Sequence, residues 1–203
     1  MRDIFRRFAR NIPAVFGLAI LVLVMGAAFF APAIYPQGPF EMVGRPFLEP
    51  LTDYLLGTDQ LGRDLGVGLL YGARVTLQIG LISTLIAIFL GLTIGGTAGY
   101  FGGWIDTLLM RITEIFQTIP FFLFAILLVA ILKPTLGSVI FAIAVVSWPP
   151  MARLVRSEFL SIRNREFVQA CIVMGMGHWQ IIFKHVLPNT LSPIIVTGSL
   201  MVA

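Results

Sequence analysis

Residues 76–101 read TLQIGLISTLIAIFLGLTIGGTAGYF and contain no charged side chain. A helix that crosses a bilayer needs about 20 predominantly apolar residues, so this stretch is long enough to span one. The whole chain of 203 residues has the same character, with 58% hydrophobic residues, 12% charged residues and a mean hydropathy of +0.93. Soluble domains carry roughly twice that share of charge. The sequence therefore predicts an all-α polytopic membrane protein, without room for a separate soluble enzyme domain.

Four further apolar stretches bring the number of predicted spans to five. The uncharged region around the quoted stretch, residues 75–105, is the second span, and the others are residues 15–30, 115–132, 136–150 and the stretch that follows Pro188. The fifth stretch reaches residue 203 without a polar flank. We expect the chain to be truncated, with at least one more span in the remainder.

Three local features of the spans carry expectations of their own. Pro120 removes a backbone donor inside the third span, which should bend or break the helix near Thr118. Trp148, at the end of the fourth span, suits the membrane interface. Gly91 and Gly95 form a small-xxx-small pair, which favours close packing against a neighbouring helix.

The basic residues predict the orientation, because their excess marks the cytoplasmic side. With a cytoplasmic amino terminus, ten basic residues face inward and four face outward. The inward set is Arg2, Arg6, Arg7, Arg10, Arg111, Arg153, Arg156, Arg163, Arg165 and Lys184. The outward set is Arg45, Arg63, Arg74 and Lys133.

The first apolar stretch has a second interpretation as a cleaved signal peptide. Basic residues precede it, and Ala31-Pro32-Ala33 loosely resembles a cleavage site. Residues 15–30 exceed the usual length of about 7 to 15 for a signal core, however, and several spans follow. We therefore favour a first transmembrane span.

The outer loop, residues 41–74, contains the sequence Leu56-Gly57-Thr58-Asp59-Gln60-Leu61-Gly62-Arg63-Asp64. Thr58 or Asp59 is a candidate cap for a short helix, and Gly57 and Gly62 would permit turns. A solvated capped turn without a binding role explains the same residues equally well.

The inner loop, residues 153–187, carries two short amphipathic patterns. Phe167, Cys171 and Met174 recur at helical spacing, and Trp179 begins a second pattern that continues at i+3, i+4 and i+7. Gly175-Met176-Gly177 separates the two patterns, and Pro188 is expected to close the second. Such helices lie flat on lipid or fit a groove in a soluble partner, and periodicity alone does not choose between these.

Three motifs resemble one family. Gln169-Ala170-Cys171, three residues, Gly175, nine residues and then His185-Val186-Leu187-Pro188 are similar to the cytoplasmic signature loop of bacterial ABC-importer permeases. The family usually has Glu-Ala-Ala and Ile-x-Leu-Pro at these places. The sequence from Leu56 to Asp64 and the Gly99-Tyr100-Phe101-Gly102-Gly103-Trp104-Ile105-Asp106 turn resemble the C-type permeases of the peptide and nickel subgroup.

The resemblance implies the transmembrane domain of a type I ABC importer, with five of six expected spans present. It would comprise a basic tail and first span (1–40), an external loop (41–74) and a transmembrane core (75–203). Its implied function is to move di- or oligopeptides, or a related small solute, across the bacterial inner membrane. The implied partners are cytoplasmic ATPase subunits, a second permease and an external solute-binding protein, with no nucleic acid.

The resemblance also implies which residues carry the function. The chain has no Gly-x-x-x-x-Gly-Lys-Ser/Thr loop, so ATP and Mg²⁺ are expected in the partner ATPase, and no catalytic, cofactor or metal site is expected here. The expected ATPase-coupling residues are Glu166, Gln169, Ala170, Cys171, Gly175, Met176, Gly177, His185, Leu187 and Pro188. The external motif consists of Leu56, Gly57, Thr58, Asp59, Gly62, Arg63 and Asp64.

The competing function is an ion-coupled or passive carrier or channel that needs no ATPase. Such proteins commonly place an acidic residue or a histidine near the bilayer midplane, and the central parts of the five predicted spans have none. Arg111 and Glu114 come nearest, and their i, i+3 spacing favours an intrahelical ion pair near the interface. This disfavours proton coupling and leaves a passive pore open.

Overall fold

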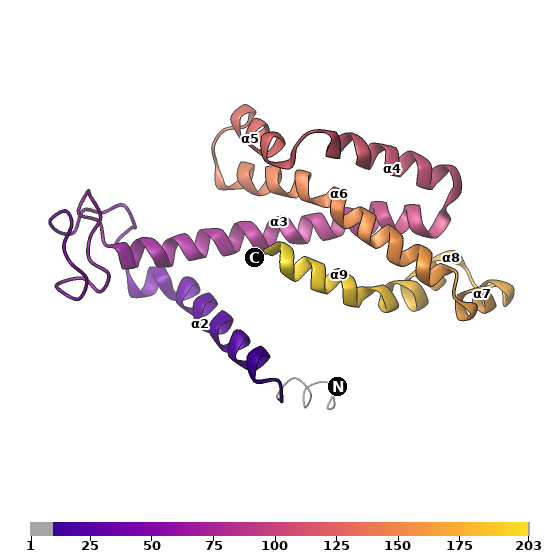
Figure 1. Ribbon diagram of the computed structural model, residues 1–203, viewed down its shortest axis with the longest axis horizontal. Coiled ribbons are helices and arrows are strands. Elements are labelled where there is room, and N and C mark those ends of the chain that lie inside the picture. Colours follow the sequence, from indigo (N-terminus) through magenta and orange to yellow (C-terminus); the bar gives the residue numbers. More distant parts are fainter. Residues whose placement is uncertain (1–9, 203) are drawn as a thin grey trace. The chain divides into compact units, whose positions relative to one another are not determined.

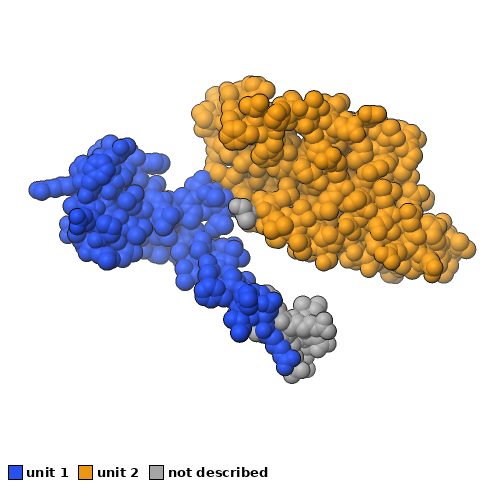
Figure 2. All heavy atoms as spheres, in the orientation of Figure 1, with its two compact units in different colours: residues 1–78 blue, residues 79–203 orange. Residues whose placement is uncertain are grey.

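The computed structural model describes residues 10–202, and Arg2, Arg6 and Arg7 of the basic tail lie outside that part, as does Ala203. Within it the chain is helical and has no β-strand, which confirms the predicted fold class. The chain divides into two compact units, residues 1–78 and 79–203 (Figure 2).

In the first unit, α2 (Ile12–Ile34) is a long apolar helix that matches the first predicted span. The Asn11 side chain caps it by accepting a hydrogen bond from the Ala14 N–H at 3.4 Å. Only Ala28 and Ala31 of α2 are buried, so its large apolar side chains are available to lipid.

The helix α3 (Leu65–Phe101) crosses the division between the units and contains the quoted stretch. It begins at Leu65, before the predicted start of this span at residue 75. The reason is a cap: Asp64 Oδ1 accepts the N–H groups of Gly66 and Val67 at 2.7 and 3.3 Å. The outer loop therefore ends at residue 64.

The second unit is built around α6 (Leu136–Arg163), which lies between α4 (Gly103–Thr118) and α9 (Leu187–Val202) in Figure 1. The buried side chains of α6 include Met151, Val155 and Phe159. The helix continues past the predicted end of this span at Pro150 and reaches Arg163. Its dense packing here outweighs the two backbone donors that Pro149 and Pro150 lack.

The side chain of Trp148 lies inside this packing and is not exposed on the surface of its unit. The side chain is buried and groups with Ala87 and Ala152. Its ring meets that of Phe116 edge to face, with centroids 5.2 Å apart. The apolar run around Trp148 does not reveal which neighbouring helix covers it.

The glycines of α3 lie against α6, as the small-xxx-small pattern predicts. A Cβ placed on Gly91 would lie 2.5 Å from Met151 Cγ, and one on Gly95 would overlap the Ala152 carbonyl oxygen. The absence of a Cβ at these positions therefore lets two helix backbones approach closely.

The third predicted span is broken, as Pro120 predicts. The helix α4 ends at Thr118, α5 (Phe121–Ile131) begins after Pro120, and the pair is bent by 81°. The helix α4 begins at Gly103 directly after the glycine turn, before the predicted start of this span at residue 115. Within the described residues four helices can cross a membrane by length and composition, or five when α4 and α5 count as one span.

The chain after α6 forms α7 (Glu166–Val173), α8 (His178–Ile181), a π-helical turn η1 (Ile182–Val186) and α9. The expectation that Pro188 closes the second amphipathic helix is wrong, because helix runs from His178 to Val202. The wider η1 turn, in which the Leu187 N–H bonds to the Ile182 carbonyl, accommodates the proline without ending the helix.

Candidate functional site

The segment from Asn164 to Val186, called the coupling segment below, has one face buried in its own unit. Val168, Cys171, Ile181 and Val186 are buried with side chains from α3, α6 and α9. The prediction that these helices are amphipathic is therefore confirmed. The buried stripe, however, follows Val168 and Cys171, whereas Phe167 and Met174 are exposed.

The opposite face of the coupling segment presents large apolar side chains. Val173 is 86% exposed, Met174 70%, Trp179 69% and Phe183 61%. The rings of Trp179 and Phe183 stack with centroids 6.1 Å apart. We call these four residues the coupling edge. Since it spans the junction between α7 and α8, its shape depends on the turn that joins these helices.

That turn is a Schellman motif centred on Gly175. The Gly175 N–H bonds to the Ile172 carbonyl at 2.9 Å, and the Met176 N–H bonds to the Cys171 carbonyl at 3.1 Å. Gly175 has a φ of +79°, which side chains rarely allow, while a Cβ on it would meet no atom within 4 Å. The requirement for glycine is therefore conformational and not steric. Met176 follows and packs onto the buried cluster.

The residues predicted for ATPase coupling lie in different surroundings in the structure. Ala170, Gly175 and Gly177 are exposed near the coupling edge, while Cys171 lies on the buried face. Among the other predicted residues, Glu166 lies in the first turn of α7, and Gln169 lies in the middle of α7 and donates from its side-chain amide to the Arg163 carbonyl. His185 lies in η1, and Leu187 and Pro188 begin α9.

One contact to the coupling segment was not foreseen from the sequence. The Tyr100 hydroxyl, near the end of α3, lies 3.1 Å from Nδ1 of His178, the first residue of α8. The two residues are far apart in sequence, and no spacing rule pairs them. The contact ties the start of α8 to α3 beside the coupling edge.

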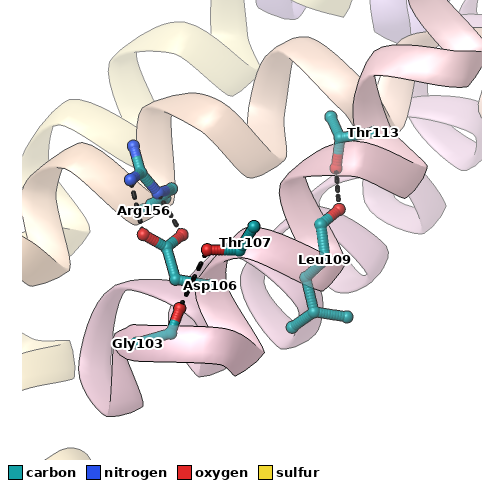
Figure 3. A network of polar contacts seen from close by, with 6 residues as sticks. All are labelled: Gly103, Asp106, Thr107, Leu109, Thr113 and Arg156. Carbon is teal, nitrogen blue, oxygen red and sulfur yellow. Dashed lines mark hydrogen bonds and ion pairs between the residues drawn. The ribbon is translucent and has the colours of Figure 1, made fainter.

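A second unforeseen contact is an ion pair between α4 and α6. Arg156 Nη2 donates to Asp106 Oδ2 at 2.6 Å, and Arg156 Nε donates to Oδ1 of the same carboxylate (Figure 3). The side chains of Asp106 and Arg156 are only 17% and 34% exposed. Asp106 belongs to the glycine-turn motif. From the sequence, Arg156 is identified only as one of the basic residues that mark the cytoplasmic side. Antiparallel packing of α4 on α6 brings them together.

The predicted pair of Arg111 and Glu114 is present, with 3.0 Å between Nη1 and Oε2. Both side chains are more than half exposed, so the pair contributes little to stability.

In the first unit, the external motif folds as a set of turns whose polar atoms are satisfied within the loop. The Thr58 hydroxyl donates to the Arg45 carbonyl at 2.6 Å and accepts the Leu48 N–H at 2.9 Å. Gly57 and Gly62 have φ values of +73° and +74°, which confirms the prediction that they allow turns.

Asp59 organises the end of this loop. Its Oδ1 accepts the N–H groups of Leu61 and Arg63 at 2.7 and 2.9 Å. The hydrogen bond from the Arg63 N–H is the main reason why the pKa of Asp59 is lowered from its ordinary value. The prediction that Thr58 or Asp59 caps a helix is wrong, because Asp64 caps α3. Thr58, Asp59 and Asp64 are all of residue types that cap helices. The hydrophobic pattern alone does not show which of them precedes the helix.

The comparisons with known proteins identify the family. The model of the binding-protein-dependent transport system inner membrane component matches residues 88–203, more than half of the chain. The chain belongs to this family. The model of the N-terminal transmembrane domain of oligopeptide transport permease C matches residues 1–50. The family resemblance inferred from the three motifs is therefore confirmed.

Individual members of the permease family are similar over nearly the whole chain. The dipeptide transport system permease protein of Alkalihalophilus pseudofirmus is 41% identical over 98% of the chain and 66% of its own length. That of Bacillus subtilis is 40% identical over 99% and 63%. The oligopeptide transport system permease protein of Haemophilus influenzae is 38% identical over 99% and 66%. The chain thus spans slightly less than two thirds of these relatives.

Proposed function

We propose that this chain is the permease subunit of an ATP-driven importer that carries di- or oligopeptides, or a related small solute, across the bacterial inner membrane. Its membership of the permease family supports the transport role. The names of its relatives, which are dipeptide and oligopeptide transport permeases, support a peptide substrate.

We propose further that the coupling edge docks into a cytoplasmic ATPase subunit, which binds ATP and Mg²⁺ and hydrolyses the nucleotide. The observation that carries this proposal is the two-sided coupling segment. Its inner face is fixed to the membrane helices, and its outer face exposes Val173, Met174, Trp179 and Phe183 without a partner within residues 10–202. Amphipathic helices use such faces to fill a hydrophobic groove.

The helical path supports the transmission of force. Because helix is continuous from His178 to Val202, a displacement of α8 moves α9 directly. Val186 in η1 and Ile194 in α9 are buried in a cluster that includes side chains of α6, so a displacement of α9 would also tilt α6. Movement against a second permease would then open the route to solute delivered by an external binding protein. The distribution of basic residues supports a cytoplasmic amino terminus.

The test is ATP-dependent uptake of radiolabelled peptide by the complete complex in proteoliposomes, with a matched pair of variants. Gly175→Val places a β-branched residue at a positive φ and should lower uptake at least tenfold, because the Schellman turn no longer forms. Gly137→Val makes the same substitution outside the coupling segment, at a glycine without a positive φ whose Cβ would have only an ordinary contact with Thr135 Oγ1 at 3.9 Å, and should leave uptake within twofold of the unmodified protein. Co-purification of all subunits verifies assembly of both variants.

Two results would contradict the proposal. Full uptake by the Gly175→Val complex would show that this turn is not required for coupling. Uptake that persists without the ATPase subunit would instead favour the carrier or channel class.

A further inference from the structure

A cavity of about 480 Å³ lies where α4 and α5 break, against α6. Its volume falls within the range of pockets that hold small molecules. Phe116, Phe124 and Pro150 contribute apolar walls, and Gln117 and Arg153 contribute the long polar side chains. None of the residues that line the cavity is acidic.

The polar groups of this cavity are mainly hydrogen-bond donors without partners. Within residues 10–202, neither the Arg153 guanidinium nor the Gln117 amide makes a hydrogen bond or ion pair. Pro120 precedes the first turn of α5 and supplies no side-chain cap for its N–H groups. Since a guanidinium can only donate hydrogen bonds and no carboxylate lies among the lining residues, this set favours an anionic ligand.

The position of Arg153 on α6 directs its charge into the cavity. Val146, Pro150 and Arg153 are spaced i, i+4 and i+7 and all line it. Side chains of a helix lean toward its N-terminus, so the guanidinium leans back toward Pro150. Arg153 is exposed and lies three residues before Arg156, toward the cytoplasmic end of α6 in the predicted orientation.

We propose that this cavity is a transient binding site for the terminal carboxylate of the transported peptide, an inference that rests on the proposed function. Arg153 would hold the carboxylate by two parallel charge-assisted hydrogen bonds. Gln117 would donate a further hydrogen bond, and the aromatic walls would contact a side chain. A terminal carboxylate is common to unmodified peptides of any sequence, so a site for it suits a route that admits different side chains.

The test measures two rates in the same proteoliposomes: uptake of radiolabelled dialanine and ATP hydrolysis stimulated by the loaded binding protein. Arg153→Gln should lower uptake at least tenfold and leave stimulated ATP hydrolysis within twofold, because the docking surface is unchanged. Arg153→Lys, which keeps the charge without the planar fork, should recover uptake to within about threefold. The control is Arg111→Gln, at an exposed arginine outside the cavity, which should leave both rates unchanged.

Failure of this inference is distinguishable from failure of the proposed function. Unchanged uptake in Arg153→Gln, or a parallel loss of uptake and ATP hydrolysis, would overturn the carboxylate site while the transport function stands. Absence of ATP-dependent dialanine uptake by the unmodified complex would instead count against the proposed function.

A second arm distinguishes the peptide carboxylate from the phosphate of a lipid headgroup. The uptake defect of Arg153→Gln should be the same in vesicles of phosphatidylcholine alone and in vesicles that also contain phosphatidylglycerol. A dipeptide with a diazirine on its C-terminal residue should label residues 116–124 or 146–153, and this labelling should disappear in Arg153→Gln. A defect confined to anionic vesicles, or labelling confined to other segments, would overturn the proposal.

Discussion

At the scale of single residues, the ion pair of Asp106 and Arg156 links α4 to α6 through two hydrogen bonds (Figure 3). Two parallel hydrogen bonds fix the guanidinium in the plane of the carboxylate, which a lysine could not reproduce. Both side chains are shielded, so removal of one partner leaves the other charge poorly solvated.

We expect Asp106→Ala to lower the free energy of unfolding by about 1.5–3 kcal/mol, the usual range for a hydrogen bond to a charged group. Thermal unfolding of the purified complex in detergent measures the change. The matched control is Glu114→Ala, which breaks the exposed Arg111 pair and should cost less than about 0.5 kcal/mol. Equal effects of the two variants would show that the Asp106 pair has no special role.

The Asp59 carboxylate gives the external loop a dependence on pH. Its pKa in the folded loop lies below the ordinary value of 3.8, mainly because the Arg63 N–H bonds to the charged form. The stabilisation is therefore fully present above that ordinary value and is lost as the pH falls through the lower folded pKa.

We expect Asp59→Ala to speed hydrogen exchange of the Leu61 and Arg63 amides at pH 7, since both lose their acceptor. The difference from the unmodified protein should shrink as the pH falls below about 4. Hydrogen exchange followed by mass spectrometry of residues 56–64 measures it. A difference that stays constant down to about pH 2 would disprove the linkage to this carboxylate.

At the scale of secondary-structure elements, close packing of α3 on α6 depends on positions without a Cβ. A Cβ on Gly95 would meet the Ala152 backbone directly, whereas a Cβ on Gly72, in the same helix, would have no atom within 4 Å. Helix propensity is equal at the two sites, so the same substitution separates packing from propensity.

We expect Gly95→Ala to destabilise the protein by about 1–3 kcal/mol through overpacking. Gly72→Ala should be neutral or stabilising by up to about 1 kcal/mol, since alanine favours helix. Thermal unfolding of each variant in detergent provides the comparison. Equal melting temperatures would contradict the close approach of α3 and α6.

The sequence predicts those elements whose signal is local. The apolar stretches give the spans, Pro120 gives the break before α5, and the glycine at 175 gives the turn after α7. Features that depend on a distant partner are missed. The burial of Trp148 needs the neighbouring α3 and α4, and helix persists through Pro188 because the η1 turn widens. The Asp106 pair likewise depends on the packing of α4 on α6.

At the scale of the whole molecule, different parts of the chain have different tasks. The long apolar helices can cross the bilayer, and α6 packs against the other helices of the second unit. The coupling segment buries one face in this unit and exposes the coupling edge on the other. The proposed coupling role depends on one central claim, which is that a protein groove and not lipid covers that edge.

Site-directed cross-linking tests this claim most directly. Cys171 is buried, so it is first replaced by serine, and Met174→Cys, on the exposed edge, then carries a photoreactive probe in the assembled complex. Leu200→Cys, exposed on α9, is the control for contact with lipid. We predict that Met174→Cys cross-links to the ATPase subunit while Leu200→Cys does not. Cross-links from Met174→Cys to phospholipid alone would contradict the docking of the coupling edge into a protein groove.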